Sequence, residues 1–325
     1  MFNFFSLFCC CLAGPGHRAA QNLKGLATKG LLHPPLIMDH RAVVQLFHAP
    51  AGGREANDAN NAVREAAIID LINGGRPDRA YDLLRAELQL WLAGKRAELG
   101  LSPEVTARAV ARGGRSYNWD FDLILGALTL KVEFKYGATS VASLPEFFNP
   151  AANKNFHQGE SYARYFYEHT LPQVCAIYNI PLTMSVDDYL ARVHGTSKAP
   201  ALFGALYEAE KAGTAEQKAY KKELVDESIA AWLHLVKDKT DLAAITTAFQ
   251  TSQTGKQFLL CSNGKFFSDR IEPEELVVTA VRGVRLGKYL ELQSSRPNTG
   301  FSLLLRWKNH AGILYPAWQI SMWRY

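Results

Sequence analysis

The chain has 325 residues, of which 48% are hydrophobic and 21% are charged, so it can bury the core of one large domain or of two ordinary ones. This composition excludes wholesale disorder, and the formal net charge of +5 fits a polyanionic partner without requiring one. The five cysteines show neither a CxxC pair nor a regular spacing. We therefore expect no zinc site and no disulfide framework, and we predict a reduced, intracellular protein of the cytoplasm or nucleus.

The first 13 residues are almost wholly apolar. This run is too short to span a bilayer as a helix, and it lacks the positive start of a secretory signal, so no stable membrane span is expected. We predict that residues 1–37 are a disordered leader, or lie upstream of a true start at Met38. Acylation of the cysteines in this run is the alternative, and it would make the protein peripheral to a membrane.

Residues 38–183 are predicted to form an α/β core whose first elements are helical. Apolar residues recur at three- and four-residue steps over residues 58–73, which predicts a helix. Pro77 is well placed for the first turn of a second helix. Residues 105–110 alternate between apolar and polar side chains, and this stretch is either a strand or a short helix.

Two β-rich segments, residues 119–125 and 128–134, follow in the predicted core. They are joined by Gly126-Ala127, and a connection of two residues predicts a hairpin. An aromatic-rich helix is expected over residues 162–178, and Pro172 should interrupt or bend it.

The chain changes in character near residue 256. Residues 184–255 are predicted to be a helical region inserted after the core. Residues 256–325 are predicted to form a separate β-rich unit, an antiparallel sheet of short strands. This unit should begin with a hairpin at Asn263-Gly264, a dipeptide that two-residue turns favour.

Acidic and basic residues alternate with apolar ones along the hairpin predicted around Gly126-Ala127. Because alternate residues of a strand face the same side, Asp120 and Asp122 share a face, and so do Glu133 and Lys135. Carboxylates brought together in this way repel one another unless a cation lies among them. Their oxygens suit Mg²⁺ or Mn²⁺, so the sequence predicts a metal site formed by Asp122, Glu133 and Asp120.

This pattern resembles the PD-(D/E)XK nuclease superfamily, in which an acidic residue on one strand precedes Glu or Asp, any residue and Lys on the next. Ten residues separate Asp122 from Glu133, and twelve separate Asp120 from it. The proline that precedes the first acid in this family is absent, because Trp119 stands before Asp120. The choice between the two aspartates is therefore open, and we favour Asp122 because a core strand follows it directly.

The resemblance covers roughly residues 55–180. It implies a restriction-endonuclease-like core sheet flanked by helices, and a magnesium-dependent nuclease that acts on DNA. It also implies that Lys135 orients the attacking water or stabilises the pentacovalent phosphorus. Many members add a glutamate from a helix before the sheet, and Glu65 is the candidate here, unless it is a surface residue of its helix.

The sequence leaves a non-enzymatic alternative open. A nucleic-acid-binding or structural protein could retain a nuclease-like core as a scaffold, with the acidic pair neutralised by Lys131 and Lys135. Cleavage of DNA in the presence of a divalent cation separates this alternative from the nuclease hypothesis.

Overall fold

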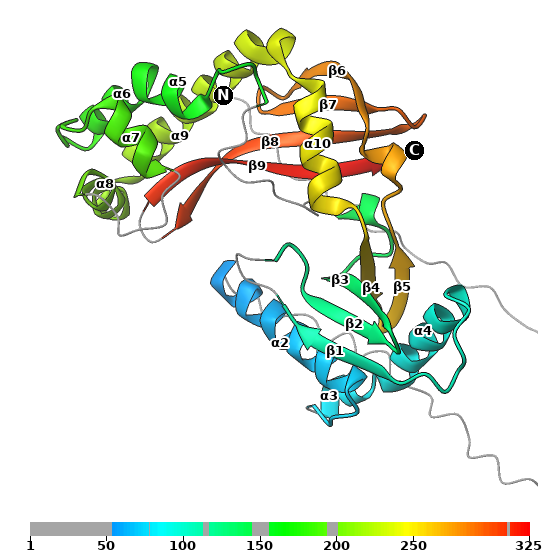
Figure 1. Ribbon diagram of the computed structural model, residues 1–325. Helices are drawn as coiled ribbons and strands as arrows, with labels where there is room; N and C mark the ends of the chain where they lie inside the picture. The colour runs from blue at the N-terminus through cyan, green and yellow to red at the C-terminus, as the bar shows by residue number, and fades with distance from the viewer. Residues whose placement is uncertain (1–53, 78, 113–116, 145–155, 194–200, 311–312) are drawn as a thin grey trace, which may run out of the picture. The chain divides into compact units, whose positions relative to one another are not determined.

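The structure is a computed structural model that describes residues 54–77, 79–112, 117–144, 156–193, 201–310 and 313–325 (Figure 1). The predicted leader, residues 1–37, and the alternative start at Met38 lie outside these ranges. The described residues have a mixed α/β architecture with two sheets. Over the described ranges, none of the helices combines the length and the apolar character that crossing a bilayer requires.

The first sheet has five strands, which follow one another across the sheet in chain order. They are β1 (Ala107–Ala111), β2 (Phe121–Leu125), β3 (Leu128–Tyr136), β4 (Lys256–Ser262) and β5 (Lys265–Asp269). β1, β2 and β3 pair antiparallel, β4 runs parallel to β3, and β5 returns antiparallel to β4. A parallel pair needs a long crossover, and here the helical part of the chain between β3 and β4 supplies it.

Both predicted hairpins are confirmed. Leu125 pairs with Leu128 across Gly126. The φ angle of Gly126 is 60°, which glycine adopts at little energetic cost. Ser262 likewise pairs with Lys265, the neighbours of the Asn263-Gly264 turn. The stretch 105–110, left open between strand and helix, contributes to β1.

From residue 54 onward, where the described part of the chain starts, three helices precede the first sheet: α2 (Arg54–Ile72), α3 (Arg79–Asp82) and α4 (Arg85–Glu98). The two longer ones carry apolar residues that pack on one face of the sheet, and the buried cluster includes Ile68, Leu71, Leu88, Phe121 and Leu123. Val132 and Phe134 of β3 belong to the same cluster. The polar residues between these apolar ones on β2 and β3 therefore face the other side of the sheet.

The described α-helices between β3 and β4 are α5 (Tyr162–His169), α6 (Leu171–Ile177), α7 (Val186–Val193), α8 (Ala201–Ala212), α9 (Ala215–Val236) and α10 (Leu242–Gln253). The helical region therefore begins before the expected residue 184, because α5 and α6 share a buried core with the later helices. The interruption expected at Pro172 is confirmed, since α5 ends at His169 and the proline stands in the first turn of α6. α9 begins at a capping box, in which Thr214 and Gln217 exchange hydrogen bonds.

The second sheet is antiparallel and consists of β6 (Val278–Arg285), β7 (Tyr289–Ser294), β8 (Thr299–His310) and β9 (Ile313–Arg324). The short helices η1 (Val141–Ser143), η2 (Lys237–Lys239) and η3 (Pro273–Leu276) lie in connections. One face of the sheet is apolar, and its core includes Trp232 and Phe249 from the helices together with Phe301, Leu303 and Ile320.

The C-terminal β unit differs from the expected range of residues 256–325. Residues 256–269 form β4 and β5 of the first sheet, and the antiparallel sheet starts at Val278. The physical reason lies in β4, whose residues Phe258, Leu259 and Leu260 are all fully buried. A strand whose consecutive residues are all apolar is buried on both faces only when it lies inside a sheet. β4 has this position, because it lies between β3 and β5.

Candidate functional site

The polar residues of the Gly126-Ala127 hairpin lie on the face of the first sheet opposite α2 and α4. Asp122 pairs directly with Lys131, and the main-chain amide of Asp120 donates to the carbonyl of Val132 at 3.0 Å. In the register of β2 and β3, Asp120 would oppose Glu133, but this bond goes to Val132, and Asp120 lies in a bend just before β2. The expectation of a shared face is confirmed for Asp122, Glu133 and Lys135, which lie on the paired strands, whereas Asp120 stands before the first residue of β2.

Glu133 is the centre of the arrangement and is only 8% exposed. Its Oε1 lies 2.6 Å from Nζ of Lys135, and its Oε2 accepts from Nζ of Lys256 at 3.1 Å. Both carboxylate oxygens are thus held by ammonium groups, one from the same strand and one from β4.

Asp120 lies next to this ion-paired group. Its Oδ2 accepts from the main-chain amide of Phe134 at 2.8 Å, which fixes the carboxylate against β3. Burial and the nearby negative charge of Glu133 raise the pKa of Asp120 to about 6, although Lys135 partly opposes the shift. A carboxyl with such a pKa is sensitive to any added positive charge, because a cation would restore its ionised form.

Glu65 reaches the same electrostatic environment from α2. Burial raises its pKa to about 7, and the negative charges of Asp120 and Glu133 add to the effect, while Lys135 lowers it. Its side chain is half-buried, so the alternative of a plain surface residue does not fit its surroundings. Glu65 is thus coupled electrostatically to Asp120, Glu133 and Lys135, although α2 packs on the other face of the sheet. We call these four residues with Lys256 the carboxylate–lysine cluster.

The lysines of the cluster respond to the carboxylates in opposite ways. Burial favours the neutral form of Lys135, but the charges of Glu133, Asp120 and Glu65 outweigh it, and the pKa of Lys135 is raised. Lys256 is only 4% exposed, and burial lowers its pKa despite the pairing with Glu133. Of the two lysines, Lys135 has the more exposed side chain, at 28% against 3% for Lys256.

Asp122 has different partners. Its Oδ2 lies 2.7 Å from Arg112, and its Oδ1 accepts from Nε1 of Trp119 at 2.7 Å. It is 7% exposed, and both of its oxygens are already bonded. The sequence favoured Asp122 as the first acid, but the geometry favours Asp120, which shares the charge environment of Glu133 and Lys135. Asp122 instead links β2 to Trp119, in the segment just before that strand, and to Arg112, just after β1.

Carboxylate oxygens and charge balance make the cluster chemically suited to a divalent cation. Three carboxylates, those of Glu65, Asp120 and Glu133, face two ammonium groups, so one negative charge is in excess when all are ionised. The hard oxygen ligands fit Mg²⁺ or Mn²⁺, and Asp120 and Glu133 would hold the ion with Glu65 nearby. Among the described residues, however, no three His, Cys, Asp or Glu side chains are already arranged as a metal site.

Lys256 is the residue that the sequence did not identify. It stands 123 positions after Glu133 and is brought to it only by the parallel pairing of β3 and β4. The available signal was a single lysine at the start of an apolar strand, directly after Gly255. Such a lysine normally marks a solvated strand end, so nothing local distinguishes it.

Comparisons of the chain with protein-family models, with curated proteins and with solved structures found no match. The resemblance to the PD-(D/E)XK superfamily therefore depends on the motif residues and on the geometry described above.

Proposed function

We propose that this chain is a metal-dependent nuclease that hydrolyses phosphodiester bonds, with DNA as its substrate. The observation that carries the proposal is that Glu133 pairs with Lys135 on β3, while the carboxylate of Asp120 is bonded to the amide of Phe134 between them. Glu65 is coupled electrostatically to the same groups. When its carboxylates are ionised, the cluster has an excess of negative charge that a divalent cation would neutralise. A cation held there would supply the activation of water that such a reaction needs.

The order of elements supports a restriction-endonuclease-like core. Helix α4 precedes β1, the acidic residues stand at β2, Glu133 and Lys135 stand on β3, and a helix follows. This is the order that the resemblance implies. The region from α5 to α10 is then an insertion before the parallel strand β4, and the second sheet is an addition to this core.

In the proposed reaction, a water oxygen bonds to phosphorus while the bond from phosphorus to the leaving oxygen breaks. The water loses a proton, and the leaving oxygen gains one. Lys135 places its ammonium beside the phosphate, where it offsets the charge that develops on the equatorial oxygens. Asp120 and Glu133 would hold a divalent cation, which when bound lowers the pKa of water and neutralises the phosphate.

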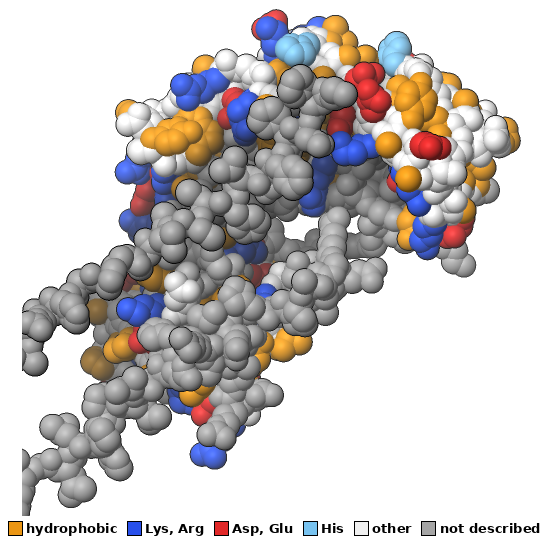
Figure 2. Space-filling view, turned by 180° about the vertical axis from the view of Figure 1, so that it is seen from behind, with side chains coloured by type: hydrophobic (Ala, Val, Ile, Leu, Met, Phe, Trp, Pro, Cys, Tyr) orange, Lys and Arg blue, Asp and Glu red, His pale blue; other side chains and the backbone are white. Residues whose placement is uncertain are grey.

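Aromatic and basic side chains next to the cluster support a nucleic-acid substrate. The rings of Tyr117 and Trp119 pack edge to face with centroids 5.0 Å apart, and Arg112 lies over the Tyr117 ring. Tyr117 is 39% exposed, so a base can stack on it. Elsewhere the charge distribution is less informative, because the basic side chains visible in Figure 2 are interspersed with acidic and apolar ones.

The test is cleavage of supercoiled plasmid, single-stranded DNA and RNA by the full chain with Mg²⁺, Mn²⁺ or EDTA. We expect cleavage of DNA that requires the metal and falls at least 100-fold in Lys135→Ala, in line with the loss of one electrostatic stabiliser. The matched control is Lys265→Ala, which removes an exposed lysine from β5 of the same sheet and should cleave like the wild type.

A second candidate follows from the pairing of Glu133 with two lysines. A carboxylate already neutralised by Lys135 and Lys256 is also what a non-catalytic nucleic-acid-binding or structural protein would retain. Binding of DNA without cleavage in either metal would favour this candidate and contradict the nuclease proposal.

A further inference from the structure

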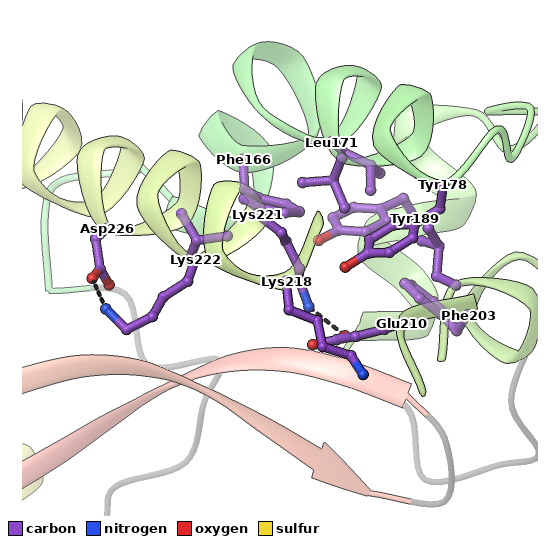
Figure 3. Close-up of a pocket in the computed structure, with 13 residues that line it drawn as sticks. Phe166, Leu171, Tyr178, Tyr189, Phe203, Glu210, Lys218, Lys221, Lys222 and Asp226 are labelled. Atoms are coloured by element: carbon purple, nitrogen blue, oxygen red, sulfur yellow. Dashed lines mark hydrogen bonds and ion pairs between the residues drawn. The ribbon is translucent and has the colours of Figure 1, made fainter. Parts of the chain in front are cut away.

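A cavity of about 270 Å³ lies in the helical region, far along the chain from the carboxylate–lysine cluster and sharing no residue with it (Figure 3). This volume is close to the lower end of the roughly 300–1,000 Å³ that small-molecule sites occupy. Its interior is mainly aromatic and aliphatic, with rings contributed by Phe166, Tyr178, Tyr189 and Phe203. Each of these four side chains is 8% exposed or less.

Two buried hydroxyl groups belong to this interior. Within the described part of the chain, neither the Tyr178 nor the Tyr189 hydroxyl has a hydrogen-bond partner. In Figure 3 both phenol oxygens point into the cavity, toward the side that carries the lysines. Burial raises the pKa of both tyrosines, so the hydroxyls are neutral and can donate as well as accept. A buried hydroxyl without a partner is unfavourable, and a ligand with polar atoms would satisfy it.

The edge of the cavity is basic. Lys221 pairs with Glu210, and Lys222 lies 2.6 Å from Asp226. Lys218 differs from both, because its ammonium donates to the main-chain carbonyl of Lys211 at 3.0 Å and pairs with no carboxylate among the described residues. Its full positive charge at the cavity edge favours an anionic group on the ligand.

We propose that this cavity binds a nucleotide, with the base among the aromatic rings and the phosphate at Lys218. The rings of Tyr189 and Phe203, whose centroids are 5.7 Å apart and whose planes are tilted by 48°, contact each other and form part of the aromatic lining that a base would meet. The hydroxyls of Tyr178 and Tyr189 then bond to ring nitrogens or exocyclic groups, which a plain acyl chain lacks. This site is separate from the proposed nuclease function and does not depend on it.

A free mononucleotide and the terminal nucleotide of a strand share this chemistry. The test therefore measures binding of adenosine 5′-monophosphate and of a 5′-phosphorylated deoxyadenosine tetranucleotide to the full chain by calorimetry in EDTA. Adenosine tests the need for the phosphate, and octanoate tests an acyl chain with an anionic end. Binding of the mononucleotide points to a free ligand as the source, and binding of the tetranucleotide alone points to a strand end.

Tyr189→Phe keeps the ring and removes one hydroxyl, and Lys218→Gln removes the charge at the edge. We expect each to weaken nucleotide binding about tenfold, the effect of one hydrogen bond or charged contact. The matched control is Lys237→Gln, a lysine that does not line the cavity. The unliganded Tyr189→Phe protein should be at least as stable as the wild type, because an unpartnered hydroxyl is gone, whereas a purely structural hydroxyl would lower its melting temperature.

The variant Lys135→Ala tests whether the cavity binds its ligand independently of the carboxylate–lysine cluster. Nucleotide binding in EDTA should persist in that variant, so that loss of cleavage and loss of nucleotide binding are independent results. The proposal is overturned if neither nucleotide binds at millimolar concentration, if octanoate binds in their place, or if adenosine binds as tightly as its monophosphate. It is also overturned if Tyr189→Phe and Lys218→Gln leave binding unchanged.

Discussion

Nζ of Lys256 lies 3.1 Å from Oε2 of Glu133, although the two residues are 123 positions apart in the chain. Lys256 opens β4, and its side chain is almost fully buried beside the carboxylate. The ammonium of Lys256 offsets part of the negative charge of the carboxylates on this face of the sheet. With Lys135 on the other oxygen of Glu133, the balance of the cluster is set by residues from two parallel strands.

Replacing Lys256 with methionine should destabilise the fold. The change removes one partner of a buried ion pair, and we expect a loss of about 3 kcal/mol in the free energy of unfolding. The control is Lys222→Met, whose 75% exposed side chain pairs with Asp226 on the surface of α9. That variant should differ from the wild type by about 0.5 kcal/mol or less. Equilibrium urea unfolding measures both, and equal losses in the two variants would refute the structural role of Lys256.

The two aspartates should respond differently to replacement by asparagine. Asp120→Asn keeps an acceptor for the Phe134 amide and removes a carboxylate whose ionised form is unfavourable in the fold. We therefore expect unchanged or higher stability at pH 8 together with at least a 100-fold loss of cleavage. Asp122→Asn weakens the pairing with Arg112 and should lower stability by about 2 kcal/mol while cleavage is retained.

This comparison is made by urea unfolding and by plasmid cleavage below the unfolding transition of each variant. Loss of cleavage in folded Asp122→Asn, with Asp120→Asn still active, would restore the original preference for Asp122 as the first acid.

The stability of the protein in EDTA should depend on pH through Asp120 and Glu65. Their pKa values of about 6 and about 7 in the folded state lie above their ordinary values of 3.8 and 4.5. The folded state therefore binds protons more tightly, so the stabilisation from these groups is complete below about pH 4 and is lost as the pH rises through 6 and 7. Allowing for partial exposure, we expect them to lower stability by about 2 kcal/mol between pH 4.5 and pH 8.

The double variant Glu65→Gln, Asp120→Asn isolates this effect. His157 works in the opposite direction, because burial lowers its pKa to about 4 and its contribution to stability grows as the pH rises toward 6.5. Both proteins contain His157, so the difference between their unfolding free energies removes it. That difference should increase from pH 4.5 to pH 8 in favour of the variant, and a constant difference would show that the two carboxyls are not shifted.

Much of the local structure could be predicted from the residues themselves. The alternation of apolar and charged residues around Gly126-Ala127 determined the hairpin and the shared face of Asp122, Glu133 and Lys135. Pro172 determined where the aromatic helix breaks. These features follow from the periodicity of strands and from turn and proline chemistry, which act over a few residues.

The tertiary structure decided what local patterns leave open. It placed residues 256–269 in the first sheet and thereby brought Lys256 to Glu133. It also distinguished Asp120 from Asp122, which are equivalent in a strand pattern, by giving one the charges of the cluster and the other Arg112 and Trp119. Strand periodicity determines which face a side chain occupies, but electrostatic partners come from segments joined by long connections, and a single sequence does not specify their pairing.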